Sequence, residues 1–67
     1  MEHLINKGLR VAHKYLLDRG YSAYDYYEYD GENVAEYYMT CAGITIENIK
    51  VYFNNNMRVT AIERVKA

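Results

Sequence analysis

The chain has 67 residues and a formal net charge of −1. A domain of this size buries only about 60% of its unfolded surface, which leaves little room for an enclosed active site. The composition, 51% hydrophobic and 25% charged, is that of a folded protein rather than a disordered one. The near-neutral charge excludes the strong basic excess of general DNA-binding or lipid-binding proteins. We therefore expect a single domain over residues 1–67.

The sequence also bears on location. No apolar run reaches the roughly 18 residues needed to cross a bilayer. The N-terminus lacks the basic start and apolar middle of a secretory signal. We expect a cytoplasmic protein with no membrane partner. The single cysteine, Cys41, cannot form an internal disulfide, and we expect it to be buried as an apolar residue.

The first predicted element is an amphipathic helix over residues 2–19, ended by Gly20. Its apolar residues recur mostly at helical spacing and predict a broad core side. They are Leu4, Ile5, Leu9, Val11, Ala12, Tyr15 and Leu16. Lys7, Arg10 and Lys14 form a basic stripe on the polar side. Leu17 lies away from the core side and is either a contact for another chain or an incidentally exposed leucine.

Residues 21–29 are rich in aromatics that favour strands, and they end at Asp30 and Gly31, a pair suited to a type I′ hairpin turn. Residues 32–40 can be interpreted in two ways. In a hairpin, Tyr27 faces Val34, although Asp25 and Glu36 then repel each other. In a helix, Asp30 caps the start and Gly43 ends it. We favour a strand.

The C-terminal third predicts a second hairpin. Residues 44–53 and 57–65 are β-rich, and residues 54–56, all asparagine, join them. Two alternating apolar stripes should face the helix, with a bulge near Glu47 and Asn48. The stripes are Ile49, Val51 and Phe53, and Met57, Val59 and Ala61. The expected fold is α+β, with one N-terminal amphipathic helix packed on a three- to four-stranded antiparallel sheet.

The most informative stretch runs from Tyr21 to Ile49, because it contains six carboxylates and seven tyrosines but no lysine or arginine. Aromatic side chains and charge complementarity are what specific interfaces use. We therefore expect this stretch to bind a basic protein. The candidate partner-binding residues are Tyr24, Asp25, Tyr26, Glu28, Tyr29, Asp30, Glu32, Glu36 and Tyr37.

Catalytic and metal-binding patterns are missing. An EF-hand alignment on Gly31 fails because Tyr26 and Tyr37 would occupy the first and twelfth ligand positions. His3 and His13 would lie about 15 Å apart along a helix and cannot share an ion. There is no glycine-rich phosphate or oxyanion loop. We expect no enzymatic activity, no metal and no cofactor.

One local run consists of Ala12, Tyr15, Leu16, Arg19, Gly20 and Tyr21. This run resembles the opening helix of small restriction-endonuclease-like and resolvase-like proteins. That family's active site needs an Asp followed by Glu-x-Lys on the next strand. Glu63 and Lys66 have one residue too many between them for that motif, so the resemblance implies no nuclease activity here.

Three functions remain open. The first is a non-catalytic inhibitor, of the kind carried by phages or mobile elements, whose acidic, tyrosine-rich surface mimics nucleic acid toward a basic, nucleic-acid-binding host protein. The second is a small homo-oligomeric scaffold or accessory subunit, and we expect a homodimer. The third is single-stranded nucleic-acid binding through the basic stripe, which the acidic middle of the chain disfavours.

Overall fold

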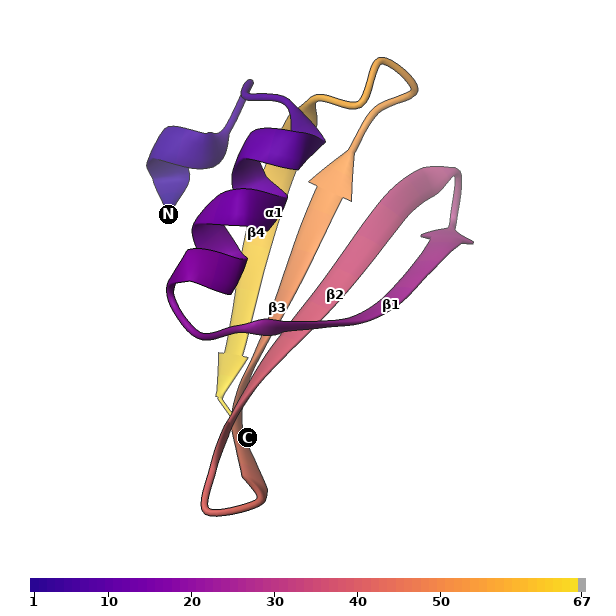
Figure 1. Cartoon of the computed structure of the whole chain (residues 1–67). Coiled ribbons are helices and arrows are strands. Elements are labelled where there is room, and N and C mark those ends of the chain that lie inside the picture. The colour runs from indigo at the N-terminus through magenta and orange to yellow at the C-terminus, as the bar shows by residue number, and fades with distance from the viewer. Residues whose placement is uncertain (67) are drawn as a thin grey trace.

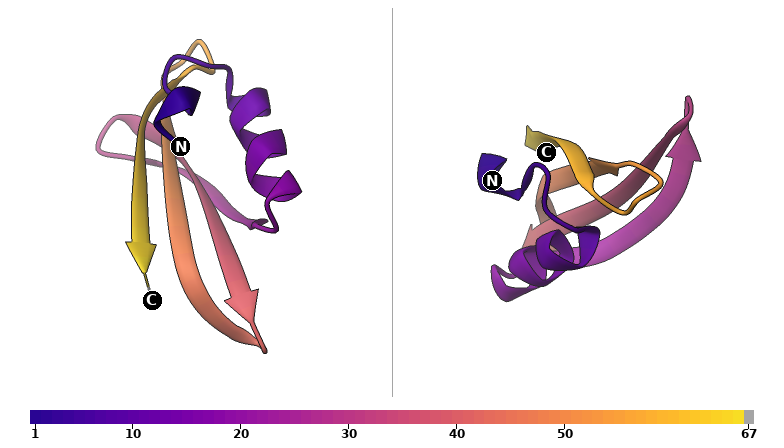
Figure 2. Two further views of the ribbon diagram at one scale, coloured as in Figure 1. Left: turned by 90° about the vertical axis from the view of Figure 1, so that its left-hand side faces the viewer. Right: turned by 90° about the horizontal axis from the view of Figure 1, so that it is seen from above.

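The computed structural model describes residues 1–66 and contains two helical segments followed by four strands. They are η1 (Glu2–Leu4), α1 (Leu9–Asp18), β1 (Ser22–Tyr29), β2 (Glu32–Cys41), β3 (Ile44–Phe53) and β4 (Val59–Lys66). The strands form one antiparallel sheet in the order β1-β2-β3-β4 (Figure 1). The helix α1 lies against one face of this sheet (Figure 2). The α+β prediction is confirmed, with four strands.

The structure resolves the ambiguity over residues 32–40, which form most of β2. Asp30 and Gly31 have φ values of 53° and 80°, as a type I′ turn requires at both central positions. The register is the one that the sequence predicted, with Tyr27 opposite Val34 and Asp25 opposite Glu36. The strong turn and the β-favouring residues therefore outweigh one repelling pair of carboxylates.

A second turn of the same kind joins β2 to β3. Its central residues are Ala42 and Gly43, with φ values of 53° and 80°. Glycine adopts this left-handed conformation freely, but the Cβ of alanine makes it unfavourable. Ala42 is therefore a strained position, which the sequence did not indicate.

The predicted helix over residues 2–19 is wrong in one respect, because it is broken between η1 and α1. Asn6 has a φ of 71°, and its N–H donates to the Val59 carbonyl at 2.8 Å. The Val59 N–H in turn donates to the Lys7 carbonyl at 2.8 Å. These bonds to the start of β4 replace the helical ones. Lys7 consequently lies outside α1, and the basic stripe is reduced to Arg10 and Lys14.

The core lies between the helices and the face of the sheet that we call the inner face. Its buried residues are Leu4, Leu9, Ala12, Leu16, Tyr21, Ala35, Tyr37, Ile49, Val51, Phe53 and Val59. Val11 was expected in this core but is 54% exposed. At about 100° per residue it points roughly 200° away from Leu9, whereas Ala12 and Leu16 return to the side of Leu9.

The stripe predicted for the last strand is also partly wrong. Phe53 pairs with Val59 but Tyr52 pairs with Ala61, so Thr60 is an extra residue that reverses the alternation. Ala61 therefore leaves the inner face, and Ile62 packs against the core instead. Met57 lies in the loop, which extends over residues 54–58. The bulge expected near Glu47 and Asn48 lies at the adjacent Ile46, since Met39 pairs with Glu47 and Thr40 with Thr45.

Candidate functional site

One face of the sheet points away from α1, and we call it the open face. It carries most of the expected acidic and aromatic residues. Side chains that pair directly across neighbouring strands lie on the same face, so the register defines its rows. One row is Asp25, Glu36, Lys50 and Glu63, and the next is Tyr27, Val34, Tyr52 and Ala61. Tyr29 and Glu32 form a third row beside the turn, and Tyr38, Asn48 and Val65 form a fourth.

The carboxylates of the open face have no cation partner within 4 Å. Over residues 1–66 the ion pairs are Lys14 with Asp18 and Glu47 with Arg64, and neither includes an open-face residue. Lys50 is the single cation in the rows, against four carboxylates: Asp25, Glu32, Glu36 and Glu63. The face therefore carries a net negative charge that faces water.

A shallow hollow of about 430 Å³ lies on this face and is lined by Tyr24, Glu36, Tyr38, Thr45 and Asn48. The rings of Tyr24 and Tyr38 meet edge to face with centroids 5.8 Å apart. Tyr24 is 69% exposed, so most of its ring is available to a partner. The hollow thus combines one carboxylate with two phenol rings, which is a suitable environment for a guanidinium group.

Two tyrosines give the open face a small apolar centre of its own. Val34 is only 1% exposed, although it lies on the face that no helix covers. Its cross-strand neighbours are Tyr27 and Tyr52. Partial desolvation, and then the nearby Glu36, raise the pKa of Tyr27. Desolvation and Glu63 do the same for the pKa of Tyr52, whose hydroxyl donates to Glu63 at 3.2 Å. Both phenols are therefore neutral at physiological pH.

Four of the predicted partner-binding residues do not lie on the open face. Tyr26 pairs with Ala35 and Glu28 with Asn33, which places both on the inner face of the hairpin. Asp30 lies in the turn. The prediction that Tyr37 contacts a partner is corrected by its burial. Its side chain is only 3% exposed and belongs to the core, so the ring cannot supply contact area to a partner.

The Tyr37 hydroxyl lies 2.9 Å from His13 Nδ1, and burial raises the pKa of this phenol. Sequence reasoning missed that Tyr27, Tyr38, Tyr52 and Glu63 belong to the open face. The alternation of Val51 and Phe53 already places Tyr52 on the opposite face, whereas placing Glu63 there requires the extra residue at Thr60.

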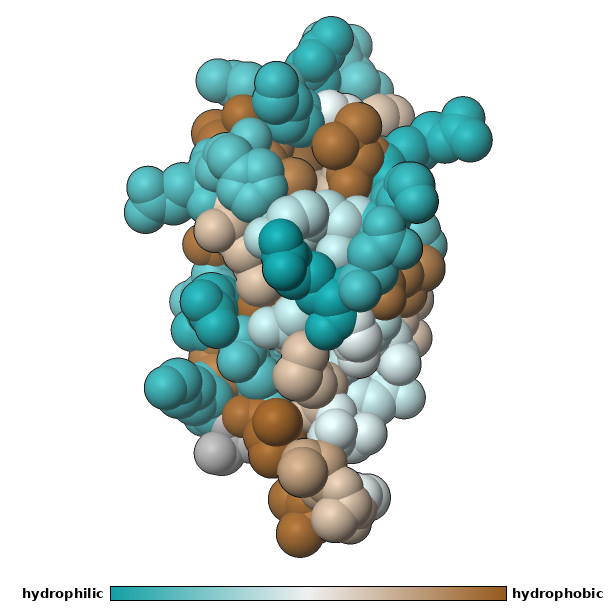
Figure 3. All heavy atoms as spheres, turned by 60° about the vertical axis from the view of Figure 1, so that its left-hand side comes forward, coloured by the Kyte–Doolittle hydropathy of each residue, from teal (hydrophilic) through white to brown (hydrophobic). Residues whose placement is uncertain are grey.

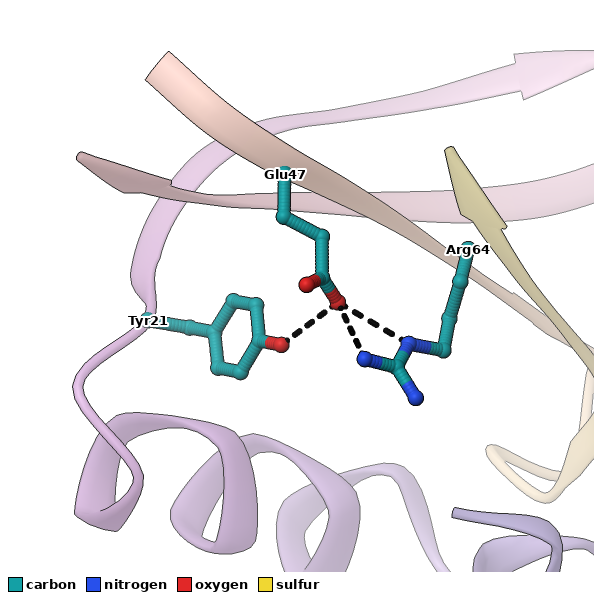
Figure 4. A network of polar contacts seen from close by, with 3 residues as sticks. All are labelled: Tyr21, Glu47 and Arg64. Carbon is teal, nitrogen blue, oxygen red and sulfur yellow. Dashed lines mark hydrogen bonds and ion pairs between the residues drawn. The ribbon is translucent and has the colours of Figure 1, made fainter. Parts of the chain in front are cut away.

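Glu47 does not contribute to the acidic surface, because Arg64 of the same chain pairs with its carboxylate. Its Oε1 atom accepts a hydrogen bond from the Tyr21 hydroxyl at 2.7 Å and another from Arg64 Nε at 2.9 Å (Figure 4). The hydrogen bond from Tyr21 and then the bond and charge of Arg64 lower the pKa of Glu47. Burial and the neighbouring Glu47 raise the pKa of Tyr21. This network connects β3 and β4 to Tyr21, in the short segment between α1 and β1.

A second concave region lies on the inner side, between α1 and the first hairpin. It is a groove of about 920 Å³ with apolar and charged walls. Its lining comprises Leu9, Arg10, Val11, His13 and Lys14 of α1, and Ala23, Tyr24, Asp25, Tyr26, Ala35, Glu36 and Tyr37 of the sheet. Arg10 and Lys14, the remainder of the basic stripe, line the α1 side of this groove.

The turn between β2 and β3 forms an apolar tip at the lower end of the molecule (Figure 3). Ile44 is 68% exposed there and Ile46 is 43% exposed. Cys41 is exposed at the same tip, so the expectation that it is buried was wrong. The hairpin extends beyond α1, and no second layer covers its end (Figure 1). Leu17, the other candidate contact, is 42% exposed on α1.

Residues 1–66 lack two further features. No three histidine, cysteine, aspartate or glutamate side chains in this range gather in a way that could hold a metal ion. No helix in the same range is both long and apolar enough to span a bilayer. Comparison of the chain with protein-family models, curated proteins and solved structures found no match. The open face must therefore be interpreted from its own geometry.

Proposed function

We propose that the protein is a small, non-catalytic binding module that engages a basic, nucleic-acid-binding protein through its open face. The observation that carries this proposal is the hollow that Glu36 lines together with Tyr24 and Tyr38. An arginine of the partner would place its guanidinium group against the phenol rings and donate hydrogen bonds to the carboxylate. Neither contact requires a catalytic group.

The remaining carboxylates extend this interaction beyond one arginine. Asp25 lies directly across from Glu36, where Cβ atoms are about 5 Å apart. Glu32 lies on the same strand and face as Glu36, four residues away, which is about 13 Å at about 3.3 Å per residue. Charges at such spacings resemble the phosphates that a nucleic-acid-binding surface accepts. The module would therefore compete with nucleic acid and act as an inhibitor of its partner.

The test uses the partner recovered by affinity capture from native cells and then purified. The variant Glu32→Lys with Glu36→Lys should weaken binding by at least about tenfold, since two of the four carboxylates of the face become cations. The matched control, Glu2→Lys with Asp18→Lys, makes the same change in net charge on the helical side and should bind like wild type. The wild type should displace nucleic acid from the partner. Equal losses in both variants, or binding without displacement, would contradict the proposal.

A second candidate, self-association, is favoured by the apolar tip. Cys41 and Ile44 are both exposed there, and joining two tips would remove apolar surface from water. Sedimentation equilibrium should then give a dimer that Ile44→Ser converts to a monomer, and mild oxidation should link the dimer through Cys41. A monomer at all concentrations would exclude this candidate and leave the first one intact.

A further inference from the structure

The outer edge of β1 has a backbone arrangement that follows from the register. The two-residue turn makes Tyr29 and Glu32 a hydrogen-bonded pair. Because bonded and non-bonded pairs alternate in an antiparallel ladder, Tyr27 bonds toward β2, while Tyr26 and Glu28 direct their backbone groups away from it. The Asp25 carboxylate accepts a hydrogen bond from the Tyr26 N–H at 2.8 Å, which requires that this N–H point away from the ladder.

This edge has no strand partner among residues 1–66, since β1 pairs with β2 alone. The Tyr26 carbonyl and both backbone groups of Glu28 are therefore available to an additional strand. Free edges of this kind are a common docking site for extended peptides, which bind by main-chain hydrogen bonds and gain specificity from alternate side chains.

The side chains on the two faces of such an added strand would contact different kinds of residue. On the open face its neighbours are Asp25, Tyr27 and Tyr29, which favour basic side chains. On the inner side its neighbours are Tyr26, Glu28 and the groove beside α1, where Val11 is 54% exposed. Apolar side chains fit there, because they would cover Val11 and the ring of Tyr26.

A second copy of the chain does not satisfy these requirements at β1. In antiparallel pairing of two β1 edges, the register centred on Asp25 sets the two Asp25 carboxylates against each other, and the register centred on Glu28 does the same for Glu28; like charges across strands are destabilising. The same charges attract a basic strand. Acidic residues on an edge therefore act both against self-pairing and in favour of a basic partner.

From this geometry we infer that β1 is a docking edge for an extended partner segment in which basic and apolar residues alternate. The segment adds as a fifth strand, with its basic side chains on the open face and its apolar side chains in the groove beside α1. This inference rests on the proposed function and specifies how the basic partner binds.

The experiment uses a synthetic peptide of about ten residues that alternates arginine and valine, which is enough to span a typical strand. A peptide of the same composition with its arginines and valines in two blocks is the control for charge alone. Glu28→Pro removes an edge N–H without removing a ladder bond, and Glu28→Ala removes the same charge but keeps the N–H. Circular dichroism of both variants checks that the sheet is retained.

The alternating peptide should bind Glu28→Pro about tenfold or more weakly than Glu28→Ala, because the proline blocks a main-chain hydrogen bond. In the wild type, hydrogen exchange of the Glu28 amide should slow when the alternating peptide binds and stay unchanged with the block peptide. This second measurement decides the question even if Glu28→Pro does not fold.

Equal affinity of the two Glu28 variants, equal affinity for the two peptides, or no slowing of exchange at Glu28 would each overturn the docking edge. The proposed function would survive such a result if Glu32→Lys with Glu36→Lys still weakens binding of the natural partner by at least about tenfold. If that double variant binds the partner normally, the proposed function itself fails, whatever the peptide does.

Discussion

Removing the Tyr21 hydroxyl tests the network that holds the C-terminal hairpin to the end of α1. In Tyr21→Phe the ring stays in the core, where the residue is 6% exposed, and one hydrogen bond to the Glu47 carboxylate is lost. Bonds to charged groups contribute about 1.5 to 3 kcal/mol. We expect the lower end, about 1.5 kcal/mol, because Arg64 still donates to the same oxygen.

In a domain of this size, that loss should lower the melting temperature by about 6 to 12 °C at neutral pH. The pH dependence has a definite sign. The folded-state pKa of Glu47 lies below its ordinary value of 4.5, so its contribution to stability is fully present above that value and is lost as the pH falls through the lowered pKa. The difference between wild type and Tyr21→Phe should therefore be complete at about pH 7 and shrink toward about pH 2.

The assay is thermal unfolding followed by circular dichroism across this pH range. Tyr29→Phe is the matched control, since Tyr29 is 70% exposed on the open face, and its melting temperature should equal that of the wild type. If Tyr21→Phe stays within about 0.5 kcal/mol of wild type, or if the difference persists unchanged in acid, the reasoning about this network is refuted.

Three further predictions concern single positions. Val34→Ala should cost about 2 kcal/mol in urea unfolding although the residue lies on the open face, whereas Val11→Ala should change stability by less than about 0.5 kcal/mol; equal effects would show that the burial of Val34 is wrong. Ala42→Asn should stabilise the protein by about 0.5 to 1 kcal/mol, because asparagine accepts the positive φ of the turn better than alanine; a destabilised variant would mean that the turn is of another type. The Cys41 thiol should react with an aromatic disulfide reagent as fast in the native protein as in urea, and slow reaction in the native state would contradict its exposure.

Much of the fold could be predicted because its signals are local. The Asp30-Gly31 turn fixes the register of the first hairpin, since its backbone conformation is available to few residue pairs. The β3 bounds, Ile44–Phe53, and the buried alternation of Ile49, Val51 and Phe53 follow from period-two patterning. These features depend on neighbours in sequence and were confirmed.

The misplaced features depend on contacts between distant segments. Asn6 lies outside the helix because its backbone N–H bonds to Val59, which is more than fifty residues away. The spacing of apolar residues within the helix carries no information about such a distant hydrogen bond. Thr60 reverses the alternation of β4, so Ala61 and Ile62 exchange the faces that a regular strand would give them. A bulge of one residue leaves little trace in composition.

The candidate site also combines features set by the local sequence with features set by contacts between distant segments. The sequence by itself determined that carboxylates and tyrosines are concentrated between Tyr21 and Ile49 without a compensating lysine or arginine. Only the tertiary structure decided which of them face water together, because register and face depend on how strands pair. Pairing placed Asp25, Glu32 and Glu36 on the open face, buried Tyr37 beneath α1, and joined Glu47 to Arg64. Charge content is a property of the chain, whereas a charged surface exists only once hydrogen-bonded strands have fixed the direction of each side chain.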